Sequence, residues 1–511
     1  MIELNWIEIA LSLALGVITY LSSKKRSLYP LHMLQLEGYD NVEYSRWLEE
    51  NKEKINKLQY KKGEEKTPLV MTDRATRLYN TNNRLNLYTI ILLIILRIVL
   101  GKIAIWPTIL LAVAYFALYY YQYIMVAQAN LKNLPKEKKI NDGFYFQAQG
   151  KIRKLREENK LSVVGITGSF GKTSTKFISN TILSESFQVQ NTPSSYNTPM
   201  GLSKVINNDL NEEKEIFLAE LGAKVPGEIK EVADLVQPTI GVITAIGPTH
   251  MHLFKTIETI QKTKYELIEA LDEDGIAIFN YDNDYVKPLA DKTKIKTIRY
   301  GMENIENLDV YAKDIQVGER GSTFTLVVKG QGEVEASTKL LGAHNISNLL
   351  AAASIGWVLG MPLEKIASGI SKVEPVEHRL NIVDGGTGVI VIDDAFNSNP
   401  VGARAAIDVL GAFEKGKKII ITPGMVELGD MEEEENFKFG QYMANVVDYA
   451  ILVGPNRTKP IYKGLIEAGF NKDKIIVAKS LNDATASLGK LTAPGDVVLF
   501  ENDLPDTYNE E

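Results

Sequence analysis

The stretch GITGSFGKTSTK combines glycines, a lysine and a hydroxyl side chain in the order found in phosphate-binding loops. The common pattern G-x-x-x-x-G-K-[ST] would place its first glycine at position 166, where the sequence has Ile166. The chain has Gly168, Gly171, Lys172 and Thr173 instead, which makes a tighter loop. The backbone N–H groups of such a loop could bind phosphate, Lys172 could reach the terminal phosphates, and Thr173 could offer its hydroxyl to Mg²⁺. The motif favours a nucleotide site over an ordinary strand–turn–helix connection.

Three further residues that could do chemistry follow this loop along the chain. Glu220 lies at the end of the apolar run EIFLAEL, and His250 follows the run GVITAIG, with His252 two residues later. Lys264 falls in the helical pattern QKTKYELIEAL. Taken singly, Glu220 could be an edge charge, His250 a loop histidine and Lys264 part of a solvated helix face. Their order after a phosphate loop favours one shared site at the carboxyl edge of a sheet.

The elements that must position these residues follow an alternating pattern. The β-branched run LSVVGITG precedes the loop, and TSTKFISNTIL follows it with apolar residues at helical spacing. Strand-like runs (EIFLAEL, TIGVITAIG, GIAIFN, STFTLVVKG) then alternate with helical ones, and a second series begins near residue 385. The pattern predicts an α/β protein with two parallel-sheet domains in tandem. We expect a central domain of the P-loop ATPase type over 141–373 and a Rossmann-like C-terminal domain over 374–511.

The first 140 residues predict an α-helical membrane anchor. Apolar segments over 6–21, 87–100 and 103–126 give about three spans, of which the last two form a hairpin. The loop 23–84 carries thirteen Lys and Arg residues, which places it in the cytoplasm and the N-terminus outside. A cleaved signal peptide is disfavoured because SSKKR follows the first segment and no basic region precedes it. The expected location is a multi-pass protein of a bacterial-type cell membrane, whose catalytic domains are cytoplasmic and follow the polar linker KNLPKEKKINDG.

Composition narrows the classes of function. The 511-residue chain is 45% hydrophobic, which is ample for several buried cores. Its net charge of −7 gives no reason to expect nucleic-acid binding. The chain contains no cysteine, so disulfides, thiolate metal sites and cysteine nucleophiles are excluded.

The ordered motifs resemble the Mur ligase family. They are G-x-x-G-K-T, ELGA with PGEI, IGPTH, K-x-E-L, HNISN, HRL and IDDAFNSNP, and the resemblance covers roughly residues 160–500. IDDAFNSNPVGARAAIDVL and MVELGD are most similar to members that use D-alanyl-D-alanine as the amine. The resemblance implies ATP-dependent formation of an amide bond in cell-wall precursor synthesis, through an acyl phosphate that an amine attacks.

The resemblance also implies roles for individual residues. ATP would contact six residues of the glycine loop and the start of its helix, namely Gly168, Ser169, Gly171, Lys172, Thr173 and Ser174. It would also contact four residues further along the chain, namely Asn345, Asn348, Arg379 and Asp394. Thr173 and Glu220 would hold one Mg²⁺, and His250 with Lys264 would serve a second. The catalytic set would be Lys172, His250, Lys264 and Arg379, and Asn397 and Asn399 would lie near the incoming amine.

Lys264 matches the lysine that the family carbamylates with CO₂. A carbamate is an oxygen anion, which suits a hard cation, whereas an ammonium group would repel it. Asn345 and Asn348 match adenine contacts, Asp394 matches the ribose contact, and Arg379 matches the arginine that the C-terminal domain brings to the phosphates.

The N-terminal part departs from the family pattern. Mur ligases of peptidoglycan synthesis begin with a small α/β domain that binds a UDP-sugar, and here the predicted anchor takes its place. The ending FENDLPDTYNEE also lacks the usual family sequence. The acyl substrate therefore stays open between a small-molecule and a lipid-linked peptide.

Two alternative functions remain. One is a Mur-type ligase with another product, such as lipid-linked muropeptide amidation or poly-γ-glutamate-like synthesis. The other is a membrane scaffold that binds nucleotide without ligation. The intact set Lys172, Thr173, Glu220, His250 and Lys264 argues against the scaffold.

Overall fold

The structure is a computed structural model that describes residues 6–55, 68–99, 106–384, 386–396 and 398–504. The chain divides into two compact units, an N-terminal unit up to Asp142 and a C-terminal unit over Gly143–Leu504. Each unit has its own hydrophobic core.

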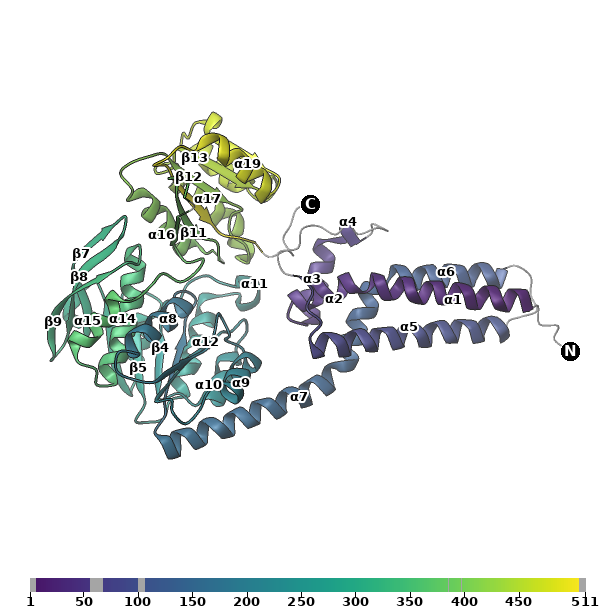
Figure 1. Cartoon of the computed structure of the whole chain (residues 1–511), viewed down its shortest axis with the longest axis horizontal. Helices are drawn as coiled ribbons and strands as arrows, with labels where there is room; N and C mark the ends of the chain where they lie inside the picture. Colours follow the sequence, from purple (N-terminus) through teal and green to yellow (C-terminus); the bar gives the residue numbers. More distant parts are fainter. Residues whose placement is uncertain (1–5, 56–67, 100–105, 385, 397, 505–511) are drawn as a thin grey trace. The chain divides into compact units, whose positions relative to one another are not determined.

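The N-terminal unit is helical (Figure 1). Its helices are α1 (Trp6–Arg26), α2 (Leu28–Leu36), α3 (Asn41–Glu50), α4 (Lys52–Ile55), α5 (Asp73–Val99), α6 (Trp106–Tyr120) and the first part of α7 (Gln122–Asn159). Helices α1, α5 and α6 pack side by side around Ile90, Leu111 and Tyr115. A second cluster includes Tyr44 and Trp47 of α3 and holds the short helices against α5 and α7.

Large apolar side chains stay exposed along helices α1, α5 and α6 of this unit. They include Leu13, Val17 and Ile18 of α1, Leu92 and Ile95 of α5, and Leu110, Val113 and Phe116 of α6. Among the described residues, α5 is long and apolar enough to cross a membrane, and the bent pair Ile109–Tyr120 with α7 would count as a second span. The length and composition of the helices thus support one or two of the three expected spans, and a span at α1 stays a prediction.

Two details of this unit differ from the sequence expectation. The segment 103–126 is predicted as one span of a hairpin, but it contains a bend of 67° between Ile109–Tyr120 and Gln122–Asn159. The stretch KNLPKEKKINDG is predicted as a linker, but it lies inside α7, with Pro135 within the helix. The helix continues there because most of these residues are adequate helix formers. Glu137 also anchors the segment, since both of its carboxylate oxygens accept hydrogen bonds of 2.6 Å from Arg77.

The C-terminal unit is built on two sheets, the first of which has nine strands. The strands are β1 (Ser162–Thr167), β2 (Val189–Asn191), β3 (Ile216–Glu220), β4 (Ile240–Ile243), β5 (Ile276–Asn280), β6 (Lys296–Gly301), β7 (Val310–Gly318), β8 (Gly321–Val328) and β9 (Gly332–Thr338). Their order is β2-β3-β1-β4-β5-β6-β7-β8-β9. Pairs from β2 through β7 are parallel, and β7-β8-β9 is an antiparallel extension.

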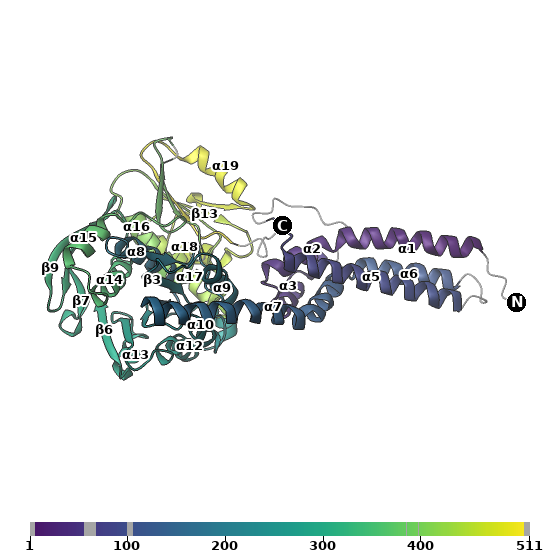
Figure 2. The ribbon, with the colours of Figure 1, turned by 60° about the horizontal axis from the view of Figure 1, so that its bottom comes forward.

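Helices cover both faces of this sheet (Figures 1 and 2). On one face α8 (Lys172–Leu183), α14 (Ala343–Val358) and α15 (Leu363–Ser371) form a core with Val164 and Ile166 of β1. The opposite core contains Val163 and receives the end of α7 together with α9 (Pro199–Asn208), α10 (Glu228–Val236), α12 (Ile257–Glu269) and α13 (Lys287–Lys292). The short α11 (Met251–Phe254) and the 3₁₀ turn η1 (Ile305–Asn307) complete this part. The alternation of β1 side chains between two cores explains why the strand is apolar throughout.

The second sheet has six strands in the order β10-β11-β15-β12-β13-β14. They are β10 (Asn381–Asp384), β11 (Ile390–Asp394), β12 (Lys418–Thr422), β13 (Tyr449–Val453), β14 (Ile475–Ala478) and β15 (Val497–Glu501). One face carries α16 (Pro400–Gly411), α17 (Glu432–Met443) and α18 (Lys459–Glu467), and the other carries α19 (Leu481–Leu491). The 3₁₀ turns η2 (Gly429–Met431) and η3 (Lys472–Lys474) lie in the connections. All pairs are parallel except β10 with β11.

The α/β class and the two largely parallel sheets agree with the sequence prediction. The run STFTLVVKG differs, because it forms β8, which is antiparallel to both of its neighbours. Only Glu319 and Arg320 separate β7 from β8. A parallel pair needs a crossover of a dozen or more residues, so a connection this short can only make a hairpin.

Candidate active site

The phosphate loop joins β1 to α8, as the sequence predicts. Gly168 has φ 154° and Gly171 has φ 79°, the left-handed conformation that glycine adopts without strain. A Cβ at Gly168 would lie 2.2 Å from the Thr244 hydroxyl oxygen, and a Cβ at Gly171 would lie 2.7 Å from Asn348 Oδ1. Backbone conformation and close packing therefore both require glycine at positions 168 and 171.

Hydrogen bonds hold the loop against the chain that follows β4. The Ser169 backbone N–H donates to the Ala245 carbonyl at 2.6 Å, and the Ser169 hydroxyl donates to the Gly247 carbonyl at 2.9 Å. Lys172 Nζ donates to the carbonyls of Gly168 (2.8 Å) and Ser169 (3.1 Å). The Lys172 ammonium thus lies over its own loop, where a phosphate group would also lie. Ser174 is in the first turn of α8.

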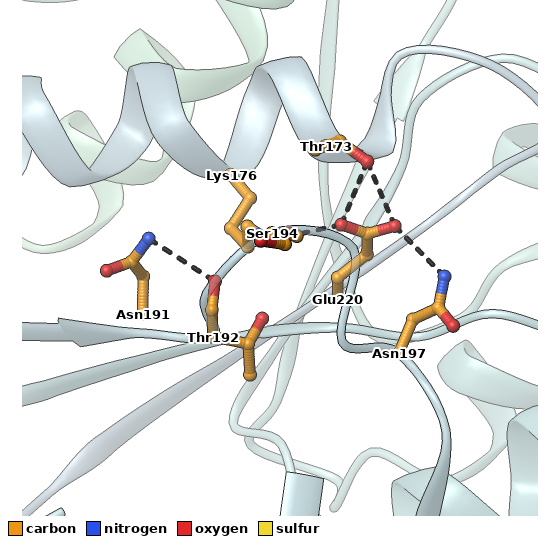
Figure 3. Close-up of polar contacts among 7 residues, drawn as sticks. All are labelled: Thr173, Lys176, Asn191, Thr192, Ser194, Asn197 and Glu220. Carbon is orange, nitrogen blue, oxygen red and sulfur yellow. Dashed lines mark hydrogen bonds and ion pairs between the residues drawn. The ribbon is translucent and has the colours of Figure 1, made fainter. Parts of the chain in front are cut away.

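Glu220 contacts the start of α8 directly (Figure 3). Ile166 of β1 pairs with Glu220 of β3, so the carboxylate emerges beside the loop at the carboxyl edge of the sheet. The Thr173 hydroxyl lies 3.1 Å and 3.0 Å from the two Glu220 oxygens. Glu220 is buried, with 1% of its surface exposed. A hydroxyl and a carboxylate at this spacing are the hard oxygen donors that Mg²⁺ prefers beside phosphates.

Lys264 is buried on α12, so the solvated-face interpretation is wrong. Only 3% of its surface is exposed, and its Nζ lies 5.9 Å from the centre of the Phe254 ring. Burial, and secondarily the charge of Lys172, lower the pKa of Lys264 to about 7. Burial likewise lowers the pKa of Lys172, with Glu220 opposing that shift. The two lysines therefore belong to one electrostatic neighbourhood.

His250 is the N-cap residue before α11 and lies in the left-handed region, with φ 48°. Its Nδ1 lies 2.7 Å from a carboxylate oxygen of Glu427, which itself has φ 64°. The contact joins the loop after β4 to the motif MVELGD, which follows β12. Of His252, the structure describes only the backbone, within α11.

Asn345 and Asn348 lie on α14, which packs directly on α8. The Asn348 amide donates to Asn345 Oδ1 at 3.1 Å, and the Asn345 amide donates to the Leu341 carbonyl at 2.9 Å. The Thr175 hydroxyl of α8 donates to Asn348 Oδ1 at 3.3 Å. The pair thus borders the phosphate loop through the contact between these two helices.

Arg379 lies two residues before β10, and Asp394 is the last residue of β11. The charges of Asp394 and Glu220 favour the Arg379 cation, but burial is the larger effect and lowers its pKa. The Arg379 guanidinium also lies 4.4 Å from the centre of the Phe396 ring. Burial raises the pKa of Asp394 to about 6, and its Oδ1 accepts from the Leu380 N–H at 3.2 Å. Arg379 therefore brings a positive charge from the residues just before β10 to the neighbourhood of Glu220 and the phosphate loop.

Asn397 and Asn399 are the two residues predicted near the amine. Asn399 caps α16, because its Oδ1 accepts from the N–H groups of Val401 (3.1 Å) and Gly402 (2.9 Å). That oxygen is therefore engaged in holding the helix. Asn397 lies outside the described residues.

Among the described residues, no group of three or more His, Asp or Glu side chains forms a ready metal cage. Thr173 and Glu220 nevertheless fit one Mg²⁺, which commonly takes one or two protein ligands and completes its shell with phosphates and water. The second predicted pair, His250 and Lys264, contributes an imidazole and an amine. It fits a hard cation only if Lys264 carries an added anionic group.

Several residues of this site escaped the sequence reasoning. Lys176 and Asn197 both contact Glu220, at 3.3 Å and 3.2 Å. Glu427 pairs with His250, and its only sequence signal is its place in MVELGD. Glu501 is fully buried at the end of β15 and accepts hydrogen bonds from Ser398 and Thr422. Burial raises the pKa of Glu501 to about 7.

Comparisons with known proteins agree with this geometry. Residues 166–356 match the Mur ligase middle domain, and residues 378–501 match the Mur ligase glutamate ligase domain. The UDP-N-acetylmuramoyl-tripeptide–D-alanyl-D-alanine ligase of Bacillus subtilis is 31% identical over 347 residues, which cover 68% of this chain and 74% of that protein.

Solved structures give the same result. The structure of MurF from Acinetobacter baumannii superposes with a TM-score of 0.64 at 26% identity, covering 71% of this chain and 78% of that one. MurF from Thermotoga maritima in complex with ADP gives 0.63 at 26% identity, covering 72% and 82%. With both domain matches on one chain and a nucleotide loop of the family's form, this protein belongs to the Mur ligase family and is an ATP-dependent ligase that forms amide bonds.

Proposed function

We propose that this ligase joins D-alanyl-D-alanine, or a closely similar amine, to the peptide carboxylate of a cell-wall precursor at the cytoplasmic face of a membrane. The observation that carries the reaction is the contact of Thr173 with Glu220 at the mouth of the glycine loop. The choice of amine is supported by the names of the relatives, which act on D-alanyl-D-alanine, and by the stretch IDDAFNSNPVGARAAIDVL.

The phosphate loop would hold ATP through its backbone N–H groups at the start of α8. Lys172 already lies over the loop carbonyls, so a small side-chain movement would bring its ammonium to the terminal phosphates. Mg²⁺ held by Thr173 and Glu220 would offset charge on the phosphate oxygens during transfer. Arg379 would add a second positive charge from the start of the C-terminal domain, while Asn345, Asn348 and Asp394 would contact the nucleoside.

The reaction then balances as two displacements. A carboxylate oxygen of the peptide attacks the terminal phosphorus, and the bond from that phosphorus to ADP breaks. The amine nitrogen attacks the resulting acyl carbon, inorganic phosphate leaves, and the nitrogen gives up a proton. The protein's part is to place the two reactants and to exclude water, because water would otherwise hydrolyse the acyl phosphate.

Lys264 would act as a carbamate beside the second metal position. Its neutral Nζ attacks the carbon of CO₂, an N–C bond forms, and one proton is lost to solvent. A pKa of about 7 leaves a substantial fraction of the amine neutral at physiological pH, which this attack requires. Burial also hinders access of water to the product. His250 would serve the same metal position with its ring.

The membrane part of the proposal is supported by the N-terminal unit. Exposed apolar side chains run along α1, α5 and α6, and α5 has the length and composition of a spanning helix. A ligase fixed at the cytoplasmic membrane surface would meet peptides carried on lipids, so a lipid-linked acyl substrate is favoured over a free UDP-linked one. The departure of the N-terminal unit from the family pattern favours, as a second candidate, a Mur-type ligase with another product, such as an amidated lipid-linked muropeptide.

The test is phosphate release by the detergent-solubilised full chain. The assay crosses UDP-linked and lipid-linked tripeptides with D-alanyl-D-alanine, single amino acids and ammonia. We expect phosphate release only when ATP, Mg²⁺, a peptide carboxylate and D-alanyl-D-alanine are all present. Release with ammonia or glutamate, and none with D-alanyl-D-alanine, would replace the proposed product by the second candidate. ATP binding with no release for any pair would contradict both.

A further inference from the structure

Lys176 is a buried lysine that the reaction described above does not use. It lies on α8, one turn after Lys172, and none of its surface is exposed. Its Nζ lies 3.3 Å from Glu220 Oε2 and donates a hydrogen bond to the Ser194 carbonyl (Figure 3). A buried ammonium is costly unless it is paired and hydrogen-bonded, and Lys176 has both kinds of partner.

Thr173 and Lys176 lie three residues apart, so they share one face of α8. Both contact Glu220 from that face (Figure 3). Asn197 adds a third donor, with its Nδ2 3.2 Å from Glu220 Oε1. The carboxylate is therefore fixed by a hydroxyl, an ammonium and an amide before any metal is bound.

The same contacts attach a loop to the site. Residues 192–198 connect β2 to α9, and Ser194 within them has φ 45°, a conformation that costs a non-glycine residue free energy. The Gly222 N–H donates to the Asn197 carbonyl at 3.1 Å, and a Cβ at Gly222 would lie within 2.9 Å of the Asn197 amide. Lys176 and Asn197 thus fasten two points of the loop to the strand that ends in Glu220.

We propose that Lys176 is a positioning residue of this ligase: it orients the Glu220 carboxylate for the metal and locks the 192–198 loop to it. The proposal rests on the proposed function only in taking Glu220 as a Mg²⁺ ligand. Lys176 touches neither nucleotide nor metal in this scheme and acts through Glu220 and the Ser194 carbonyl. Its role differs from that of Lys172, which lies on the phosphate side of the loop.

The test compares Mg²⁺-dependent ATP binding of full-length variants by calorimetry. Lys176→Met keeps the length and apolar stem of the side chain but removes the charge and the donor. Loss of a group that orients a metal ligand commonly weakens metal affinity by about 10–100-fold. We expect a loss of that size for Mg²⁺, and a change in ATP affinity of no more than about threefold in EDTA, where Glu220 has no metal to hold.

Lys214→Met is the matched control. Lys214 also donates to a backbone carbonyl, that of Val189 at 3.2 Å, but has no contact with Glu220. Its removal should leave Mg²⁺ affinity unchanged. Hydrogen exchange gives an independent reading, because Lys176→Met should raise exchange in the peptide that covers 192–198 while Lys214→Met should not.

If the single variant is too unstable to assay, the double variant Lys176→Met with Glu220→Gln tests whether the two side chains act as a pair. Removing both charges avoids leaving Glu220 buried without its cation, so its Tm should recover toward that of wild type. Unchanged Mg²⁺ affinity and loop exchange in a folded Lys176→Met protein would overturn the proposal. Wild-type protein that binds ATP without any Mg²⁺ effect would instead contradict the metal role of Glu220, and with it the proposed function.

Discussion

At the scale of single residues, the site is defined by how its charges are buried. Burial lowers the pKa of three basic groups, those of Lys172, Lys264 and Arg379. The charge of Glu220 opposes this shift at Lys172 and Arg379. Lys172, Lys176 and Arg379 place three cations near the single Glu220 carboxylate, which is unfavourable in a buried site without a bound anion. The same arrangement becomes favourable once phosphates are bound, because their negative charge exceeds what Glu220 supplies.

The carbamate at Lys264 gives a prediction of this scale. Replacing Lys264 with Ala removes both the amine and the added anion, so ligation should fall by about 10²–10³-fold, as for other lost charge-stabilising groups. Short carboxylates such as acetate should restore part of the rate by occupying the vacant position. The measurement is phosphate release by the full chain with and without acetate. Lys262→Ala, an exposed neighbour on α12, is the control and should keep wild-type activity.

The pH dependence distinguishes a carbamate from an ammonium. Only the neutral amine reacts with CO₂, and the pKa of Lys264 is about 7. Reactivation of CO₂-stripped enzyme at equal dissolved CO₂ should therefore be faster at pH 8 than at pH 6. Full activity of Lys264→Ala, or activity that does not depend on CO₂, would return Lys264 to a structural role.

The sequence predicts that the glycine loop and Glu220 lie close together, but it does not predict the partners that hold them. Lys172, Thr173 and Glu220 could be predicted because a glycine loop and a strand end each have a local signature. Lys176 has none, since a second lysine in GKTSTK is as compatible with a solvated helix face as with burial. Its partner Ser194 is eighteen residues away in sequence, and the contact exists only once β2, β3 and α8 are packed. Glu427 is more distant still from His250.

At the scale of elements, the phosphate loop works because β1 is central and α8 begins at a glycine. β1 lies between β3 and β4, so Glu220 and the His250 loop emerge on its two sides. Gly171 caps α8 with φ 79° and leaves no room toward Asn348. A helix start of this kind directs unpaired N–H groups at a bound anion.

Replacing Gly171 with Ala tests the loop as an element. A left-handed non-glycine residue costs roughly 1–2 kcal/mol, and the new Cβ would also displace Asn348. We expect Tm to fall by about 2–8 °C, using the usual relation for domains of this size, and ATP affinity to fall at least about tenfold, one decade per 1.4 kcal/mol.

Gly150→Ala is the control for that experiment. Gly150 lies inside α7 with open space around it, so Ala should leave ATP binding unchanged and stabilise the helix by about 0.5–1 kcal/mol. Differential scanning fluorimetry and ATP titration measure both effects. Equal ATP affinity in Gly171→Ala and wild type would show that the loop does not hold the phosphates.

Two features of the helices and strands could not be predicted from local sequence patterns. Strand periodicity identified β1, β3, β4 and β5, but it could not give the direction of β8, which depends on a two-residue connection. The pattern over 132–143 predicts a linker because of Pro135 and the charged residues, but the segment lies inside α7. The contact of Glu137 with Arg77, 60 residues away in sequence, helps to hold the segment in place and has no local sequence signal.

At the scale of the whole molecule, an apolar helical unit and a ligase unit share one chain. Val126 and the start of β1 at Ser162 are 36 residues apart. Most of that stretch belongs to α7, and a fully helical segment of this length spans about 54 Å. If the N-terminal unit lies in a membrane, the catalytic domains cannot move far from its surface. The helical conformation of α7 sets that limit, whatever the arrangement of the two units.

Tethering of this kind should matter only for substrates in the same membrane. A tethered domain meets lipid-linked peptides at high effective concentration, which commonly raises apparent affinity by about 10²–10⁴-fold. We therefore expect full-length enzyme to use lipid-linked tripeptide in liposomes at least about a hundredfold better than the fragment 143–511, while both use soluble UDP-linked peptide equally. ATP titration of the fragment checks that it is folded. Efficient use of the soluble substrate by both proteins, and of the lipid-linked one by neither, would mean that the N-terminal unit serves something other than substrate access.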